Sequence, residues 1–164
     1  MFTKNWYKLH GLGWFNYKAQ LRKVDGSYAN SYYSSFGNIY SSLELFKSTP
    51  SVQSNKNSAG IVFGSGATPP TVNDYFLENM ITTISGSGTR VFSDNGDSVT
   101  VTYTYSLSNT GSSDVTISEL GIQISISNTG IVLVNRILLD SPVTIPAGGL
   151  GQVVFTTRLD YPTA

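Results

Sequence analysis

Residues 98–107, SVTVTYTYSL, alternate strictly between apolar and hydroxyl-bearing side chains. Successive side chains of a β-strand point to opposite faces, so this pattern predicts a strand with one buried face and one hydroxyl-rich face. Such a strand is typical of an antiparallel sheet that has water on one side. The apolar set comprises Val99, Val101, Tyr103, Tyr105 and Leu107.

Similar apolar stretches recur along residues 57–164, separated by turn-forming residues. The segments SNTGSSD (108–114) and SDNGDS (93–98) are rich in Asn, Asp and Gly, which favour tight turns. Gly121 indicates a bulge or a close packing contact inside a strand. A spacing of about ten residues predicts an all-β, antiparallel β-sandwich of seven to eight strands. The predicted strands are 61–63, 80–84, 89–93, 98–107, 115–127, 131–139, a short strand within 140–151, and 152–159.

The first 56 residues have a different pattern, with both tryptophans and most of the tyrosines. Asp25-Gly26 is typical of a hairpin turn. The spacing of the aromatic residues over 28–46 also fits a helix, although the Ser, Asn and Gly content argues against one. We predict an aromatic N-terminal arm or hairpin over 1–56, ending in linker-like composition, and a β-sandwich domain over 57–164.

The arm is a candidate docking element for a neighbouring subunit. Tyrosine and tryptophan supply large contact areas at protein interfaces. The alternative is that the arm caps its own sandwich, and the sequence favours neither. The candidate partner-binding residues are Trp6, Tyr7, Trp14, Phe15 and Tyr17.

Charge is sparse and unevenly placed. Charged residues make up 12% of the chain, and the formal net charge is +0. Residues 1–56 contain seven basic and two acidic residues, a net charge of +5, whereas residues 57–164 contain three basic and eight acidic residues, a net charge of −5. The two parts could pair head to tail between copies, or could be two unrelated solvated surfaces.

The composition limits the available chemistry. The chain has no cysteine, so disulfides, thiolate metal sites and cysteine nucleophiles are excluded. The single histidine, His10, cannot form a multi-histidine metal site and lies far from any nucleophile motif. The N-terminus lacks the apolar core of a signal peptide, and no run approaches the ~20 apolar residues of a membrane span. We expect no enzyme activity, no cofactor, no metal and no membrane contact.

The Gly-rich loop after residues 61–63 invites comparison with a phosphate site. A phosphate-binding loop needs Lys-Ser/Thr and a helix after its last glycine. Here Gly64-Ser65-Gly66 is followed by Pro69 and Pro70, which force an extended chain. We therefore predict a stiff structural loop, in which Asp74 fixes the turn that follows it and Tyr75 and Leu77 fill the edge of the core.

The sequence contains weak signals for three other ligand classes: calcium, nucleic acid and glycans. Asp94 and Asp97 form the closest carboxylate pair, but their Asn-Gly context favours a solvated turn over a calcium site, whose D-x-D-x-D-G pattern is absent. The basic residues of the arm are dispersed and the chain is neutral, so we expect no nucleic-acid binding. Exposed aromatic residues could stack on sugars, which leaves a glycan-binding module as an alternative.

Two segments carry a resemblance to a known family. The segment GIVFGSGATPPTVNDYFLENMI (60–81) resembles a pattern of small structural proteins of tailed bacteriophages, with an apolar strand, G-x-G-x-x-x-P and D-Y-x-L. The segment LLDSPVTIPAGGLGQVVFTTRLDYPT (138–163) resembles their usual ending. The segment YSLSNTGSSDVTISELGI (105–122) looks like the strand-turn-strand of Ig-like domains. The arm matches no pattern of this kind.

The resemblance implies a virion component with an Ig-like or jelly-roll-like sandwich. We expect a non-enzymatic, multi-copy protein that binds other virion proteins through its arm, and a capsid-attached decoration protein in particular. The alternatives are a tail or fibre-adaptor subunit, or a glycan-binding β-sandwich module.

Overall fold

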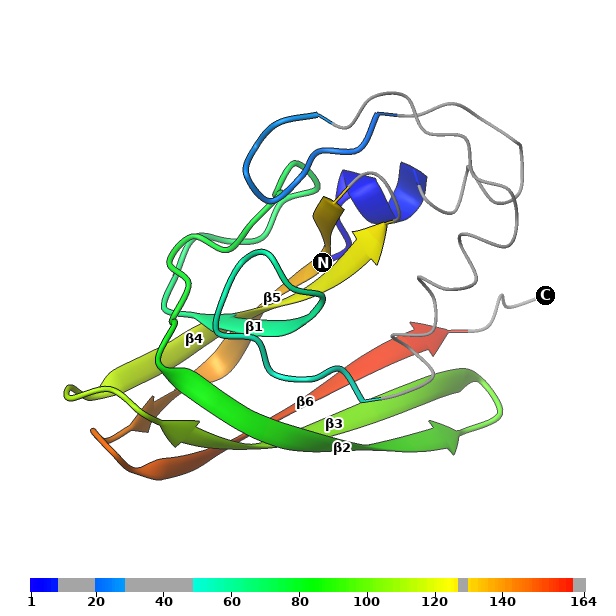
Figure 1. Cartoon of the computed structure of the whole chain (residues 1–164). Helices are drawn as coiled ribbons and strands as arrows, with labels where there is room; N and C mark the ends of the chain where they lie inside the picture. The colour runs from blue at the N-terminus through cyan, green and yellow to red at the C-terminus, as the bar shows by residue number, and fades with distance from the viewer. Residues whose placement is uncertain (9–19, 29–48, 127–129, 161–164) are drawn as a thin grey trace.

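The computed structural model describes residues 1–8, 20–28, 49–126 and 130–160. These residues form two three-stranded antiparallel sheets and a short helical turn that begins at Lys4 (Figure 1). One sheet has the order β1-β4-β5 and the other β2-β3-β6. The strands are β1 (Gly60–Gly64), β2 (Ile84–Asp94), β3 (Ser98–Asn109), β4 (Val115–Ile126), β5 (Gly130–Ile145) and β6 (Leu150–Asp160). The all-β prediction is confirmed, but the seven to eight strands and an Ig-like topology are not.

Strand β2 is longer than the sequence pattern predicts. It includes residues 85–88 (SGSG), which separate two of the predicted strands, whereas residues 80–83 lie outside it. Its pairing with β3 is continuous from Ile84 opposite Asn109 to Asp94 opposite Val99. Cross-strand pairing therefore overrides the low strand propensity of serine and glycine, because strand propensity depends strongly on context.

Strand β5 also merges two predicted strands. It runs through residues 140–142, where the sequence Asp-Ser-Pro predicted a break. The break appears instead as an irregularity in pairing with β4, since Glu119 is opposite Leu138 but Ile117 is opposite Val143. A bulge of this kind bends the strand without ending it.

The two sheets face each other in a sandwich-like arrangement and enclose the core. The alternation of β3 is confirmed at Tyr103, Tyr105 and Leu107, which are buried between the sheets. On the outer face, the Thr102 and Thr156 hydroxyls are 3.0 Å apart. The core cluster comprises Ile61, Phe63, Ile84, Tyr103, Tyr105, Leu107, Ile117, Leu120, Ile145, Val153 and Phe155.

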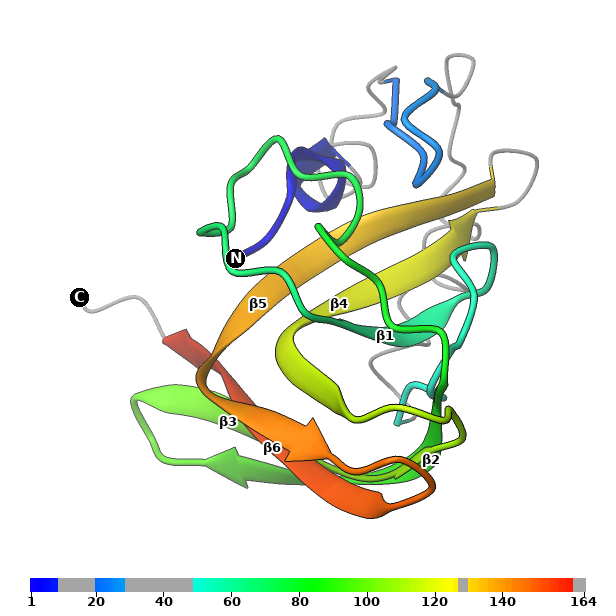
Figure 2. The same cartoon turned by 90° about the vertical axis from the view of Figure 1, so that its left-hand side faces the viewer.

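The second face of the β1-β4-β5 sheet is also covered. Figure 2 shows the loop between β1 and β2 and the N-terminal turn on this face, opposite the β2-β3-β6 sheet. Gly121 makes the close contact that the sequence predicted, because a Cβ there would lie 2.8 Å from Leu133 Cδ1 and 2.9 Å from Leu77 Cδ2. Burial on both faces explains why β4 and β5 are apolar along most of their length.

Two predicted turns are confirmed. Gly96 adopts a φ of 82° in the turn between β2 and β3. Gly26 adopts a φ of 85°, and the Lys23 N–H donates to the Ser27 carbonyl at 2.8 Å. The flanks of the predicted hairpin and the alternative helix over 28–46 lie largely outside the described residues.

Candidate functional site

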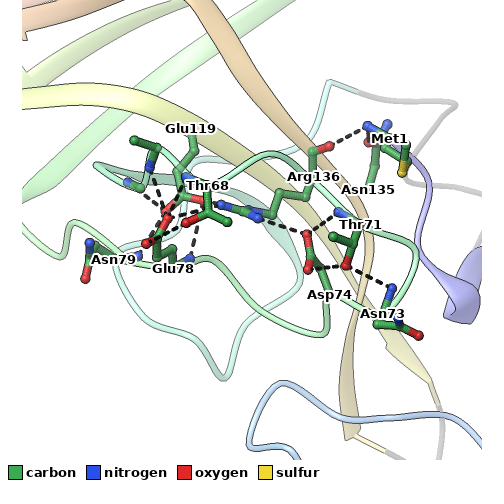
Figure 3. A network of polar contacts seen from close by, with 12 residues as sticks. Met1, Thr68, Thr71, Asn73, Asp74, Glu78, Asn79, Glu119, Asn135 and Arg136 are labelled. Atoms are coloured by element: carbon green, nitrogen blue, oxygen red, sulfur yellow. Dashed lines mark hydrogen bonds and ion pairs between the residues drawn. The ribbon is translucent and has the colours of Figure 1, made fainter.

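A buried ion pair lies on the covered face of the β1-β4-β5 sheet. Arg136 from β5 and Glu119 from β4 are both buried, and the Arg136 Nε donates to Glu119 Oε2 at 2.7 Å (Figure 3). Two further carboxylates come from the loop between β1 and β2. Arg136 Nη1 donates to Asp74 Oδ2 at 2.9 Å, and Arg136 Nη2 is 3.6 Å from Glu78 Oε2. We call Asp74, Glu78, Glu119 and Arg136 the ionic network.

Glu119 holds both ends of the loop that covers it. Its Oε1 accepts hydrogen bonds from the backbone N–H groups of Gly66 at 3.0 Å and Asn79 at 2.9 Å. Its Oε2 also accepts one from the Glu78 N–H at 3.3 Å. Because a buried N–H group needs a partner, one carboxylate satisfies three donors that the sheet cannot reach.

The same network occupies the backbone N–H groups of the Gly-rich loop that a phosphate would need. Glu78 Oε2 accepts hydrogen bonds from the N–H groups of Ala67 at 3.0 Å and Thr68 at 2.9 Å. The N–H groups from Gly66 to Thr68 therefore point at carboxylates of the same chain. A side chain at Gly66 would collide with Glu119 Oε1, so close approach to this carboxylate explains the glycine.

Asp74 has a different role from the predicted one. Its carboxylate accepts hydrogen bonds from the Thr71 N–H at 2.9 Å and the Thr71 hydroxyl at 2.8 Å. It therefore fixes the residues before it, and the prediction that it fixes the following turn is wrong. Leu77 is buried against the sheet, as predicted. Tyr75 is half-buried, with the Arg22 guanidinium 3.7 Å from its ring centroid.

Electrostatics favour the charged forms of Asp74, Glu78 and Arg136. Burial opposes the charge on Asp74, but hydrogen bonds from Thr71 and Arg136 outweigh it and hold the pKa of Asp74 below its usual value. Hydrogen bonds from Thr68 lower the pKa of Glu78. Burial likewise opposes the Arg136 charge, yet the bonds to Asp74 and Glu119 raise its pKa. A general acid or base works best with a pKa near the operating pH, so these shifts favour a structural network over proton transfer.

The structure places two of the five predicted partner-binding residues. Trp6 is half-buried and stacks on Phe2, with ring centroids 4.5 Å apart. Tyr7 is 60% exposed. Trp14, Phe15 and Tyr17 lie outside the described residues, as does His10. The structure therefore does not test whether the five residues lie together, and their binding role stays a prediction.

The start of the arm packs on the chain's own sheet. The Thr3 N–H donates to the Val134 carbonyl at 3.0 Å, and the Arg136 N–H donates to the Met1 carbonyl at 3.0 Å. Thr3 and Asn5 are buried, and the Asn5 amide donates to the Leu133 carbonyl at 3.1 Å. Residues 1–8 thus cover the edge of β5 that faces away from β4.

Two exposed tyrosines and three basic side chains lie on or beside this docked segment. Tyr28, which follows the Asp25-Gly26 turn, is 59% exposed. Lys4, Lys8 and Arg22 line a small cavity of about 170 Å³ together with Tyr28 and, on its acidic side, Asp74. The N-terminal segments therefore present two large tyrosines beside three cationic side chains.

The remaining acidic pair lies in a turn. Asp94 Oδ1 accepts the Gly96 N–H at 2.9 Å, and Asp97 Oδ1 accepts the Ser98 hydroxyl at 2.8 Å. Within the described residues, no group of three His, Cys, Asp or Glu side chains is placed to hold a metal ion. No helix in the same residues is long and apolar enough to cross a membrane.

Sequence analysis missed the centre of the network. Glu119 and Arg136 are each the single charge of a largely apolar segment, ISELGI and IVLVNRILL. A lone charge in such a segment is a signal, because an ionised side chain is rarely buried without a partner. Pairing the two charges required the strand register, which the sequence did not specify.

Comparison with known proteins gives no match to any family model, curated protein or solved structure.

Proposed function

We propose that the chain is a non-enzymatic structural protein of a tailed bacteriophage, attached to the capsid in many copies as a decoration protein. Its sandwich would be of the Ig-like or jelly-roll-like type. The observation that carries the proposal is the pair of exposed tyrosines, Tyr7 and Tyr28, on N-terminal segments that are bonded to the sandwich. Aromatic side chains in this setting are typical anchors of a protein interface.

The docking of residues 1–8 favours such a role. Thr3 and Asn5 hold the segment on β5, so Tyr7 projects from a backbone that is already fixed. A preorganised contact residue loses less conformational entropy on binding than one on a free tail. The basic side chains beside it, Lys4 and Lys8, suit an acidic partner surface.

The ionic network supports a structural role for the body. Its charges are used to fix the loop between β1 and β2, and its pKa shifts move away from neutral pH. The proposal therefore assigns no catalytic residue, cofactor or metal to the chain.

Two alternatives make different predictions. A tail or fibre adaptor would use the same tyrosines at another place on the particle. A glycan-binding module would use an aromatic platform on the sandwich. Among the described residues of the six strands, the exposed aromatic residue is Phe92, which is 55% exposed.

The location is tested by immunogold labelling of intact particles from the source, with antibody against residues 57–164. Gold over the heads supports decoration, and gold confined to tails or fibres supports the adaptor. Particles without gold, when the antigen is shown to be accessible, count against a virion role.

The contact is tested by binding of purified variants to particles. Deleting residues 1–20 would also remove the buried Thr3 and Asn5, so point variants are cleaner. Tyr7→Ala combined with Tyr28→Ala should weaken particle binding by roughly 30-fold, the effect of losing about 2 kcal/mol at an interface hot spot. Phe92→Ala is the comparison variant for the glycan-binding alternative. Loss of binding in this variant alone would favour the glycan-binding module.

A further inference from the structure

Strand β2 forms one edge of its sheet (Figure 1). It pairs with β3 on one side, and no described residue outside β3 bonds to the backbone of residues 85–93. The edge is also exposed, with Val91 66% and Phe92 55% accessible. An edge of this kind presents a row of N–H and C=O groups that can pair with another strand.

The edge lacks most of the usual protection against pairing. Natural edge strands are commonly short, bulged, or interrupted by proline and lysine. β2 has eleven residues, contains no proline or lysine, and pairs with β3 without any register shift. Arg90 is its one charged residue before the final Asp94. A long regular edge is therefore retained, which favours an occupant over solvent.

We propose that β2 pairs with β2 of a second copy of the chain, antiparallel, about a two-fold axis through Thr89. Thr89 is the midpoint of β2, because Ile84 and Asp94 are equally distant from it. A two-fold axis at Thr89 therefore gives every residue of β2 a partner in β2 of the second copy. The result is one continuous six-stranded sheet across two copies. The contact is isologous and closes at two copies, so it does not propagate into fibres.

The side chains of β2 are complementary in this register. On the core-side face, Phe92 lies opposite the partner's Gly86 and Arg90 lies opposite the partner's Gly88, so large side chains meet residues without one. On the outer face, Val91 lies opposite the partner's Ser87. No two like charges face each other, whereas a register centred on Arg90 would oppose two arginines.

The test uses charges at the two-fold axis. Thr89 is exposed on the outer face, so Thr89→Lys and Thr89→Glu are expected to fold normally. Each variant alone places two like charges opposite each other and should weaken dimerisation at least tenfold. An equimolar mixture of the two should restore dimers, because lysine then faces glutamate. Ser106→Lys is the control, since Ser106 is exposed on the same face but lies on the central strand β3.

Sedimentation equilibrium of the full chain, up to about 1 mM, measures the effect. The wild-type mass should rise with concentration from 17.7 kDa towards twice that value. Circular dichroism confirms that each variant is folded. Rescue by the mixture, with no effect of Ser106→Lys, establishes the edge contact.

Other outcomes overturn the proposal. The β2–β2 contact is refuted if the wild-type chain is a monomer at every concentration. It is also refuted if the wild-type chain dimerises and Thr89→Lys does not change the dimerisation. Equal weakening by Ser106→Lys would mean that the sheets meet face to face. A mass that grows beyond two copies would mean an open contact, such as β2 on β6. This solution test requires no particles, so its failure is distinct from failure of the virion proposal.

Discussion

Glu119→Ala is expected to destabilise the fold strongly, because this carboxylate joins the two ends of a loop to the sheet below. The substitution leaves the Gly66, Glu78 and Asn79 N–H groups without their acceptor. It also removes the closest anionic partner of the buried Arg136.

The magnitude follows from the number and burial of the lost contacts. A lost hydrogen bond to a buried group costs about 1 kcal/mol, and there are three backbone donors here. Breaking a buried ion pair by removing one partner costs about 3–5 kcal/mol. The cost of the three hydrogen bonds is not added to this range, because one carboxylate makes both kinds of contact. We expect a loss of about 3–5 kcal/mol, or roughly 6–20 °C in melting temperature for a chain of this size.

Urea unfolding followed by circular dichroism measures the change, with three comparison variants. Asp140→Ala removes an exposed charge from β5 and should change stability by at most about 0.5 kcal/mol. Glu119→Gln keeps the shape but loses the charge, so its loss should be smaller. The double variant Glu119→Gln, Arg136→Met should lose less stability than the sum of the losses in the two single variants. A loss below about 1 kcal/mol for Glu119→Ala would refute the reasoning, since buried donors would then have found other partners.

Three further predictions concern the same fold. Gly66→Ala should lower the melting temperature measured by calorimetry, because the added methyl group displaces Glu119. The stability should fall in acid: Asp74 has a lower pKa folded than unfolded, so its contribution is present above pH about 4 and is lost as the pH falls through the folded value. Asp74→Asn should flatten this decline in urea titrations between pH 6 and 2. Tyr105→Phe should cost about 1–2 kcal/mol, because the Pro50 carbonyl, 2.9 Å from the hydroxyl, loses its donor; unchanged urea midpoints would contradict it.

Local patterns were sufficient for the parts of the fold that depend on neighbouring residues. The alternation over residues 98–107 predicted which face of β3 is buried, because the strand period of two is a property of the backbone. The glycine at position 96 marked a tight turn, because few other residues adopt its φ of 82°. The prolines after Gly66 excluded a phosphate loop in the same local way.

The local sequence pattern did not predict the lengths of the strands. Residues 85–88 resemble a turn in isolation, yet they form part of β2 because β3 supplies partners for their backbone. The same dependence makes β2 an edge, since edge position is a property of the sheet order.

The ionic network required tertiary structure altogether. Arg136 is 17 positions from Glu119 and 62 from Asp74, and only the register of β4 with β5 and the path of the loop bring them together. The sequence by itself determined that Glu119 and Arg136 each stand alone among uncharged neighbours, in ISELGI and IVLVNRILL. Folding decided that these charges meet, because burying them separately would cost more than the sandwich could offset.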